Sequence, residues 1–412
     1  MARREHLDLE VARWLVGAEG LAAVAAATAR LDAGDDVLRI GTDLRAAGFD
    51  PSRSTAVTGA AAARRHARDR WPQGERLLFT PAGLEQASDP AVSAWRARRL
   101  VGPRVEDRAA GLGGDTLAIA RTGAHVTAVD LDAARLVLLA HNAAVAGVEV
   151  ETVVDDALRR PPPAAGPVHV DPARRVDGRR VRRLADHAPS VPALLEHLAS
   201  SVAGDGVAVV LSPAVDLRDP DLPPDAELEF VQVGTQLVET VAWTGRLRTG
   251  AGARATATLL DRHAGGVVAS HSRGPRGPEL PVGPVGEVLL DVAPAAVRAR
   301  LHDELGAEVG ARRIAAGRAL LTVDATPDPN PWWTARRVEA TLPARPNAVK
   351  RWLRTVEARP LELAVHGADV DVETFRRALG RPPRGPGGRR IELVRLDAAA
   401  VAIATVPLVP NG

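Results

Sequence analysis

Between residues 101 and 212 the chain alternates short β-rich runs with longer helical stretches, and this alternation limits the fold more than any other feature. A strand that follows a helical crossover pairs in parallel with an earlier strand, so repeated units build a parallel sheet covered by helices on both faces. Strands are predicted at 101–107, 125–130, 148–154, 167–171 and 206–212, with helices at 132–147 and 191–204 among the connections. We therefore expect an α/β domain with a parallel sheet.

Two further strands, 227–234 and 253–261, have only the stretch ETVAWTGRL between them. Antiparallel strands can be joined by a short connection, whereas a parallel pair needs a crossover of a dozen or more residues. These two runs therefore predict an antiparallel hairpin at the edge of the sheet. The predicted α/β domain spans residues 76–270.

Three other segments surround this domain. Residues 1–75 have a helical apolar period and predict an N-terminal helical region. Residues 271–333 begin with HSRGPRGPELPVGPVG, whose proline and glycine content indicates a linker and connecting segment. Residues 334–412 have the order β-α-β-α-β-β, which predicts a small α+β domain, with RPPRGPGGRR (381–390) as its most loop-like stretch.

Composition excludes several kinds of site. The chain has no cysteine, which rules out disulfide bonds, cysteine-ligated zinc, iron–sulfur clusters and a cysteine nucleophile. The eleven histidines have no metal-ligand spacing, so no metal site is expected. No stretch approaches the roughly 18 apolar residues of a membrane span, and the first residues do not resemble a signal peptide. We expect a cytoplasmic protein without membrane contact.

A compact glycine cluster follows the first predicted strand: Gly111-Leu112-Gly113-Gly114, then Asp115. The dinucleotide fingerprint G-x-G-x-x-G needs a third small residue where this chain has Thr116, and this argues against a nicotinamide-dependent oxidoreductase. The cluster instead suits a ligand without pyrophosphate, whose carboxylate and ribose lie against the loop backbone.

Acidic residues end the next three predicted strands: Asp130, the pair Asp155-Asp156, and Asp171. Open α/β sheets bind ligands at the carboxyl ends of their strands. A carboxylate at Asp130 can accept both hydrogens of a ribose diol, and Asp156 is placed where it could reach an adenine amino group. With the glycine cluster, these strand ends predict a nucleoside site.

These motifs resemble those of class I S-adenosylmethionine-dependent methyltransferases. RVEDRAAGLGGD resembles their D-L-G-C-G-x-G-G-D loop, AVDLDAARLVLLAHNAAVAG their second-strand acidic motif, and VHVDPARRVDGRR occupies their fourth motif. FTPAGLEQAS and LELAVHGADVDVETFRRAL are similar to a bacterial subgroup with a C-terminal THUMP-like domain. The resemblance covers roughly residues 50–405 and implies a Rossmann-like methyltransferase domain that uses S-adenosylmethionine.

The resemblance also implies a role for each matching position. The glycines and Asp107 would hold the amino acid moiety of the cofactor, Asp130 its ribose and Asp156 its adenine, while Asp171 would face the methyl acceptor. The implied cofactor-binding residues are Asp107, Gly111, Gly113, Asp115, Asp130 and Asp156, and the implied catalytic residues are Asp171, Pro172 and Arg174.

The chain departs from the family pattern at two places. Families that methylate an exocyclic base amine have [N/D]-P-P-[aromatic] as the fourth motif, whereas this chain has D-P-A-R, with Arg174 in place of the aromatic residue. Arginine can stack on a base or bind phosphate. Glu106 and Arg108 are charged on a strand expected to be buried. Both departures leave open an alternative: a catalytically silent protein that keeps the fold and binds S-adenosylmethionine or RNA.

THUMP domains accompany RNA-modifying enzymes, so the resemblance implies RNA, either tRNA or rRNA, as the partner. Candidate contacts are Lys350, Arg351, Trp352 and Arg354 on one predicted helix, and the 381–390 loop. The expected function is therefore an S-adenosylmethionine-dependent methyltransferase that methylates a base or nucleoside of RNA.

Overall fold

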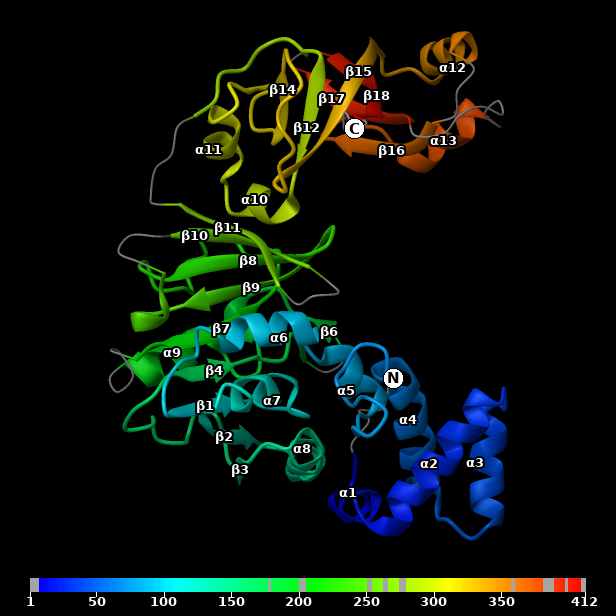
Figure 1. Ribbon diagram of the computed structural model, residues 1–412, viewed down its shortest axis with the longest axis vertical. Helices are drawn as coiled ribbons and strands as arrows, with labels where there is room; N and C mark the ends of the chain where they lie inside the picture. Colours follow the sequence, from blue (N-terminus) through cyan, green and yellow to red (C-terminus); the bar gives the residue numbers. More distant parts are fainter. Residues whose placement is uncertain are drawn as a thin grey trace. The chain divides into compact units, whose positions relative to one another are not determined.

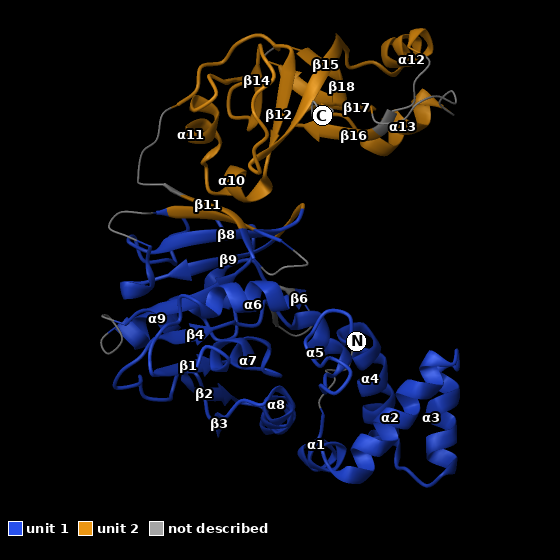
Figure 2. Ribbon diagram, viewed as in Figure 1, with its two compact units in different colours: residues 1–234, 238–254, 260–267 blue, residues 235–237, 255–259, 268–412 orange. Residues whose placement is uncertain are grey.

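The computed structural model describes residues 7–176, 179–199, 205–249, 254–261, 266–273, 279–356, 360–380, 389–396 and 399–408. The chain forms two compact units (Figure 2). The first unit comprises residues 1–234, 238–254 and 260–267, and the second comprises 268–412 with the short pieces 235–237 and 255–259.

A largely parallel sheet forms the centre of the first unit (Figure 1), and its strand order is β8-β9-β7-β4-β1-β2-β3. The strands are β1 (Arg104–Arg108), β2 (His125–Asp130), β3 (Val150–Val154), β4 (Val168–Val170), β7 (Val207–Leu211), β8 (Glu227–Val233) and β9 (Gln236–Trp243). Strand β1 pairs in parallel with β2 and β4, β2 with β3, and β4 with β7. The predicted α/β parallel sheet is confirmed.

An antiparallel strand lies at the edge beyond β7, as predicted, but the two predicted strands do not pair as a hairpin. The Leu228 amide donates to the Arg254 carbonyl and the Gly234 amide to the Leu260 carbonyl, so the stretches 227–234 and 253–261 run in the same direction. The antiparallel strand is one that the sequence did not indicate. ETVAWTGRL contributes most of β9, which pairs antiparallel with β7 and lies between β7 and β8. Trp243 at the end of β9 is fully buried. Since β9 is covered on both faces from Glu239 onward, it lacks the alternation that marks a half-buried strand. The sheet continues past β8 with β10 (Ala255–Leu260) and β11 (Val267–Arg273).

The helices that position the site begin and end at recognisable capping residues. Asp132 accepts hydrogen bonds from the Ala134 and Arg135 amides at the start of α8 (Ala133–Ala146), and Gly147 ends it in the left-handed conformation. Thr80 caps α5 (Pro81–Gln86) by accepting a hydrogen bond from the Gly83 amide. The other helices around this sheet are α6 (Pro90–Ala97), α7 (Gly114–Ala120) and α9 (Val191–Ala199).

The N-terminal region is helical, with α1 (Leu9–Leu15), α2 (Ala18–Asp32), α3 (Val37–Ala46) and α4 (Pro51–Ala67). Its apolar core includes Leu15 and Val57 and is continuous with Leu112 of the glycine loop and Leu138 of α8. The N-terminal helices therefore pack against the α/β domain, and their apolar core includes the side chain of Leu112 in the glycine loop.

Asn142 on α8 ties these parts together through its fully buried side chain. Its Oδ1 accepts the Leu78 amide at 2.8 Å, and its Nδ2 donates to the carbonyls of Leu78 at 3.0 Å and Leu112 at 3.2 Å. One amide side chain thus pairs with backbone groups from the segment before α5 and from the glycine loop.

The second unit contains a seven-stranded sheet in the order β13-β14-β12-β15-β18-β17-β16. Its elements are β12 (Val288–Val292), α10 (Pro294–Arg298), α11 (His302–Ala307), β13 (Arg312–Arg313), β14 (Leu320–Val323), β15 (Trp333–Pro343), α12 (Pro346–Thr355), β16 (Pro360–His366), α13 (Val372–Leu379), β17 (Arg389–Leu396) and β18 (Ala399–Pro407). From β15 onward the order β-α-β-α-β-β is the one predicted.

Strand β15 joins the two halves of this sheet because it pairs antiparallel with β12 on one side and with β18 on the other. The stretch 271–333, predicted as a linker and connecting segment, thus supplies three strands to the sheet that contains the C-terminal strands. Residues 274–278 and 381–388 of the two loop-like stretches lie outside the described residues.

Within the part of the chain that the structure describes, no single helix is long and apolar enough to span a membrane. Helices α1 and α2 together reach the required length and composition, but they are bent by 74° at the break between them.

We predict that Asn142→Leu lowers the free energy of unfolding by about 2–4 kcal/mol, because it leaves buried backbone groups of Leu78 and Leu112 without partners. Urea denaturation would measure this change. Ala144→Leu is the matched control, since it places the same side chain at an exposed position of α8, where surface substitutions usually change stability by less than about 0.5 kcal/mol. Equal effects of the two substitutions would contradict the role of Asn142.

Candidate active site at the carboxyl edge of the sheet

The glycine loop between β1 and α7 has two glycines in the left-handed region, Gly111 at φ +58° and Gly113 at φ +91°. A Cβ on Gly113 would lie 2.8 Å from Leu139 Cγ, so this glycine lets the loop pack on α8. A Cβ on Gly111 would meet nothing within 4 Å, so its backbone faces open space. Ala109 has φ +60° and carries the strain that a glycine would avoid there.

Asp130 at the end of β2 holds this loop in place. Its Oδ2 accepts the Gly111 amide at 2.9 Å, and its Oδ1 accepts the Asp132 amide at 2.9 Å. Burial raises the pKa of this carboxyl above its ordinary value. The next residue, Leu131, is 70% exposed, which places a large apolar side chain in solvent directly after the carboxylate.

The loop after β3 contains Asp155 and Asp156, both partly exposed. The Asp156 carboxylate accepts the Leu158 amide at 2.8 Å and lies 3.7 Å from the Arg159 guanidinium. Because β2 and β3 pair in parallel, Asp130 and this loop lie at the same edge of the sheet.

Asp107 on β1 faces inward. Its Oδ1 lies 2.8 Å from His169 Nδ1 on the neighbouring strand β4, and its Oδ2 accepts the Thr116 hydroxyl from α7. Burial would lower the pKa of His169, but the Asp107 carboxylate outweighs burial, so that the pKa is raised. Thr116, which breaks the dinucleotide fingerprint, therefore connects α7 to β1.

Asp115 in the first turn of α7 is also engaged internally. Its carboxylate pairs with Arg96 of α6 and accepts the Ser88 hydroxyl at 3.1 Å. Arg96 is almost fully buried and also pairs with Glu239 of β9. Burial would raise the pKa of Asp115, but the Arg96 charge lowers it to about 2.

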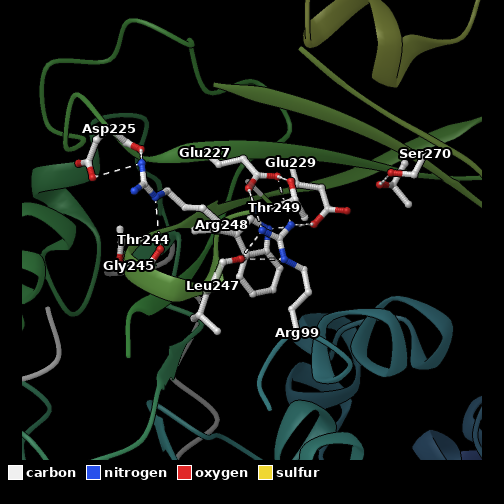
Figure 3. A network of polar contacts seen from close by, with 12 residues as sticks. Arg99, Asp225, Glu227, Glu229, Thr244, Gly245, Leu247, Arg248, Thr249 and Ser270 are labelled. Carbon is white, nitrogen blue, oxygen red and sulfur yellow. Dashed lines mark hydrogen bonds and ion pairs between the residues drawn. The ribbon is translucent and has the colours of Figure 1, made fainter. Parts of the chain in front are cut away.

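A partly buried arginine, Arg99, connects the chain just after α6 to the antiparallel edge. Figure 3 shows Arg99 pointing at Glu227 and Glu229 of β8, with N–O distances of 2.8 Å and 3.1 Å. The Arg99 guanidinium also lies over the Trp243 ring, 4.1 Å from its centroid. Glu229 accepts the indole hydrogens of Trp95 and Trp243, each at 2.8 Å. These contacts hold in place the helix that carries Arg96.

Asp171, Pro172 and Arg174 follow β4 at the same carboxyl edge. The Asp171 carboxylate accepts no hydrogen bond among the described residues. Its burial, together with the negative charge of Asp115, raises the pKa of Asp171 to about 7 although Arg174 opposes the shift. Pro172 is buried and Arg174 is partly exposed. Asp171 thus differs from Asp107, Asp115 and Asp130, whose oxygens are hydrogen-bonded.

Glu106 and Arg108 form a buried pair on the opposite face of β1 from Asp107. Arg108 Nε lies 2.6 Å from Glu106 Oε1, and its two terminal nitrogens donate to the carbonyls of Ala157 at 2.6 Å and Pro161 at 2.8 Å. Arg160 donates to the other Glu106 oxygen at 3.0 Å. The charged residues that depart from the family pattern therefore fasten the loop after β3 to the central strand.

The structure brings the glycine loop, Asp130, Asp156 and Asp171 together at one edge, while the Asp107 and Asp115 carboxylates point into internal pairs. Sequence reasoning missed Arg96, Leu131 and the contact between His169 and Asp107. The register of β1 against β4 sets Asp107 opposite His169, and the sequence has no sign of that pairing.

Among the described residues no group of three potential ligands could hold a metal ion.

Three comparisons agree with this architecture. Residues 334–406 match the family model described as THUMP domain-like. The chain is 29% identical over 330 residues to an uncharacterized S-adenosylmethionine-dependent methyltransferase of Mycobacterium tuberculosis, found in two strains, with 80% of this chain and 87% of the relative covered. A crystal structure of a candidate methyltransferase from Porphyromonas gingivalis superposes with a TM-score of 0.74 at 19% identity, covering 97% of this chain and 98% of that one.

The chain therefore has homologues among S-adenosylmethionine-dependent methyltransferases, it has a Rossmann-like methyltransferase fold, and it has a THUMP-like domain at its C-terminus. These findings confirm the resemblance and the fold class predicted from the sequence. The roles of individual site residues stay predictions.

We predict that Arg108→Met lowers the free energy of unfolding by about 3–5 kcal/mol, because Glu106 stays buried with only Arg160 as a partner and the Ala157 and Pro161 carbonyls lose their donor. A double-mutant cycle with Glu106→Gln, measured by urea denaturation, should give an interaction energy of about 1–3 kcal/mol. Additivity of the two substitutions within about 0.5 kcal/mol would show that the pair does not act as a unit.

Proposed function

We propose that this protein transfers a methyl group from S-adenosylmethionine to RNA, with the reaction at the carboxyl edge of the first unit's sheet. The observation that carries the proposal is the convergence there of an open glycine backbone, the Asp130 carboxylate and Asp171, which has no hydrogen-bond partner among the described residues. The methyltransferase homologues and the THUMP-like domain support the same conclusion.

The residues present fit the cofactor. The Gly111 backbone offers an unobstructed surface, the two Asp130 oxygens keep acceptor capacity beyond their amide contacts, and exposed Leu131 offers an apolar face to a planar base. Asp156 would reach an exocyclic amine from the neighbouring loop. When bound, S-adenosylmethionine supplies a methyl group on a sulfonium, which is an activated leaving group.

With such a leaving group, the protein mainly supplies alignment and exclusion of water. Asp171 is the group best placed to take a proton from the acceptor, because its oxygens accept no internal hydrogen bond and its pKa lies near 7. Pro172 offers its carbonyl as a second acceptor, and Arg174 carries positive charge beside Asp171.

Several features support RNA as the acceptor. THUMP domains accompany RNA-modifying enzymes, and residues 334–406 match the THUMP-like family model. Helix α12 of this domain presents Arg351 and Arg354 as exposed cations, with Lys350 partly exposed, and no ion pair involves them among the described residues. Trp352 packs against the core of this domain, which favours a structural role for it.

The proposal predicts that the purified protein transfers labelled methyl groups from S-adenosylmethionine to total bacterial RNA, with mass spectrometry identifying the methylated nucleoside. The rate should rise with pH through about 7 as Asp171 loses its proton, since only the carboxylate can accept another. Asp171→Asn should remove this rise and most of the rate. Cofactor binding without any transfer would favour the catalytically silent alternative.

Asp130→Asn should weaken binding of S-adenosylhomocysteine by about 10–100-fold, because hydrogen bonds to a charged acceptor contribute about 1.5–3 kcal/mol each. Isothermal titration calorimetry measures this change. Glu149→Gln is the matched control: it neutralises an exposed carboxylate at the amino end of β3, away from the predicted ribose site. An unchanged Kd for Asp130→Asn would remove Asp130 from the site.

A further inference from the structure

The segment that follows Asp171 leaves the sheet and is closed by a backbone pair between its two ends. Ala173 and Ala188 pair with each other, amide to carbonyl, at 2.8 Å and 3.1 Å. Between them, β5 (Arg175–Val176) and β6 (Arg179–Arg180) form a two-stranded antiparallel ribbon. Leu184 and His187 are buried and anchor the return. We call residues 174–187 the arginine segment.

Its charge is strongly positive. The arginine segment has six arginines and two aspartates, a formal net charge of +4, whereas the whole chain has only +2. Arg179, Arg182 and Arg183 are exposed, and Arg174 is partly exposed. None of these four side chains has an ion pair or hydrogen bond among the described residues.

The abundance of arginine in this chain does not by itself explain the arrangement. Some exposed arginines elsewhere in the same unit lie beside carboxylates, as Arg65 and Arg68 do on either side of Asp32 at 3.0 Å and 2.9 Å. Others, such as Arg104 and Arg121, have no ion pair among the described residues but lie far apart in the chain. The arginine segment differs from both cases because it gathers Arg174, Arg179, Arg182 and Arg183 within ten residues, all without an ion pair among the described residues. A concentrated excess of positive charge repels itself, so a bound polyanion would relieve the repulsion.

The position of the segment is as informative as its charge. It begins three residues after Asp171, the group proposed to face the acceptor, and Arg174 is close enough to influence the pKa values of both Asp171 and His187. Any acceptor that reaches Asp171 must therefore approach beside the arginine segment.

We propose that the arginine segment binds the phosphate backbone of the RNA acceptor and so holds a nucleotide beside Asp171; this inference rests on the proposed function. Arginine is suited to the task because its planar guanidinium binds phosphate oxygens in a bidentate manner. Contacts of this kind fix the register and orientation of a nucleic acid and carry no sequence information themselves. The first unit would thus bind RNA through its own surface, in addition to the THUMP-like domain.

The test compares two double variants of the full chain that lose the same charge. Arg182→Ala/Arg183→Ala removes two exposed cations of the arginine segment. Arg104→Ala/Arg121→Ala removes two exposed cations at the amino edge of the same sheet, at the start of β1 and after α7. Binding of an unmodified tRNA transcript is measured at a series of salt concentrations, and thermal melting checks that both variants fold.

Each lost phosphate contact reduces the slope of log K against log salt by about 0.7–0.9. For Arg182→Ala/Arg183→Ala, the magnitude of this slope should therefore fall by about 1.4–1.8, and binding should weaken. The amino-edge variant should keep the wild-type slope. Equal slopes in both variants, no binding of the transcript by the wild-type protein, or binding of DNA but not RNA would each overturn the proposal.

Calorimetry with S-adenosylhomocysteine separates this inference from the proposed function. Both variants should bind that ligand as the wild-type protein does, because neither pair touches the predicted cofactor residues. If the wild-type protein does not bind S-adenosylhomocysteine but the two variants still differ in the salt dependence of RNA binding, the proposed methyltransferase function is wrong. The proposal that the arginine segment binds RNA is then retained.

Discussion

An arginine buried in a protein must have its charge compensated there, because the energetic cost of removing it from water is several kcal/mol. Much of the first unit is arranged around that requirement. Arg108 has no exposed surface and is compensated by Glu106 and by backbone carbonyls of the loop after β3. Arg96 is compensated by Asp115 and Glu239, which connects α6, α7 and β9. Removing either arginine would leave a buried carboxylate with less compensation, Glu239 in the case of Arg96 and Glu106 in the case of Arg108.

These pairs determine which carboxylates remain available for chemistry. Asp115 is committed to Arg96, and Asp107 is committed to His169 and Thr116, so neither needs a ligand to satisfy it. Asp171 lies in the same charged neighbourhood without a pair of its own, and the Asp115 charge helps to keep its pKa near 7. The internal ion pairs thus leave one carboxylate poised between its two protonation states at the edge where the acceptor is expected.

The same edge links the two proposals. Cofactor contacts are proposed on the β1–α7 loop and the ends of β2 and β3, whereas the arginine segment follows β4. Since β1 pairs with both β2 and β4, these loops emerge at the same edge from neighbouring strands. A parallel sheet therefore brings a nucleoside site and a phosphate-binding surface together, although they are formed by segments up to about 70 residues apart in the chain.

The sequence by itself determined the parallel sheet, the strand ends that carry acidic residues and the β-α-β-α-β-β order of the C-terminal domain, because hydrophobic period and capping residues are local properties. It also located the glycine loop, whose conformation depends on Gly111 and Gly113. It did not identify β9 as a strand, because a strand buried on both faces lacks alternation. Only the tertiary structure decided that Glu106 and Arg108 form a buried clamp, that Asp107 and Asp115 face inward and that Asp171 does not share their pairing. Those outcomes depend on strand register and on partners far away in the chain, such as Arg96 with Glu239, which are 143 residues apart, and no local sequence pattern records such pairings.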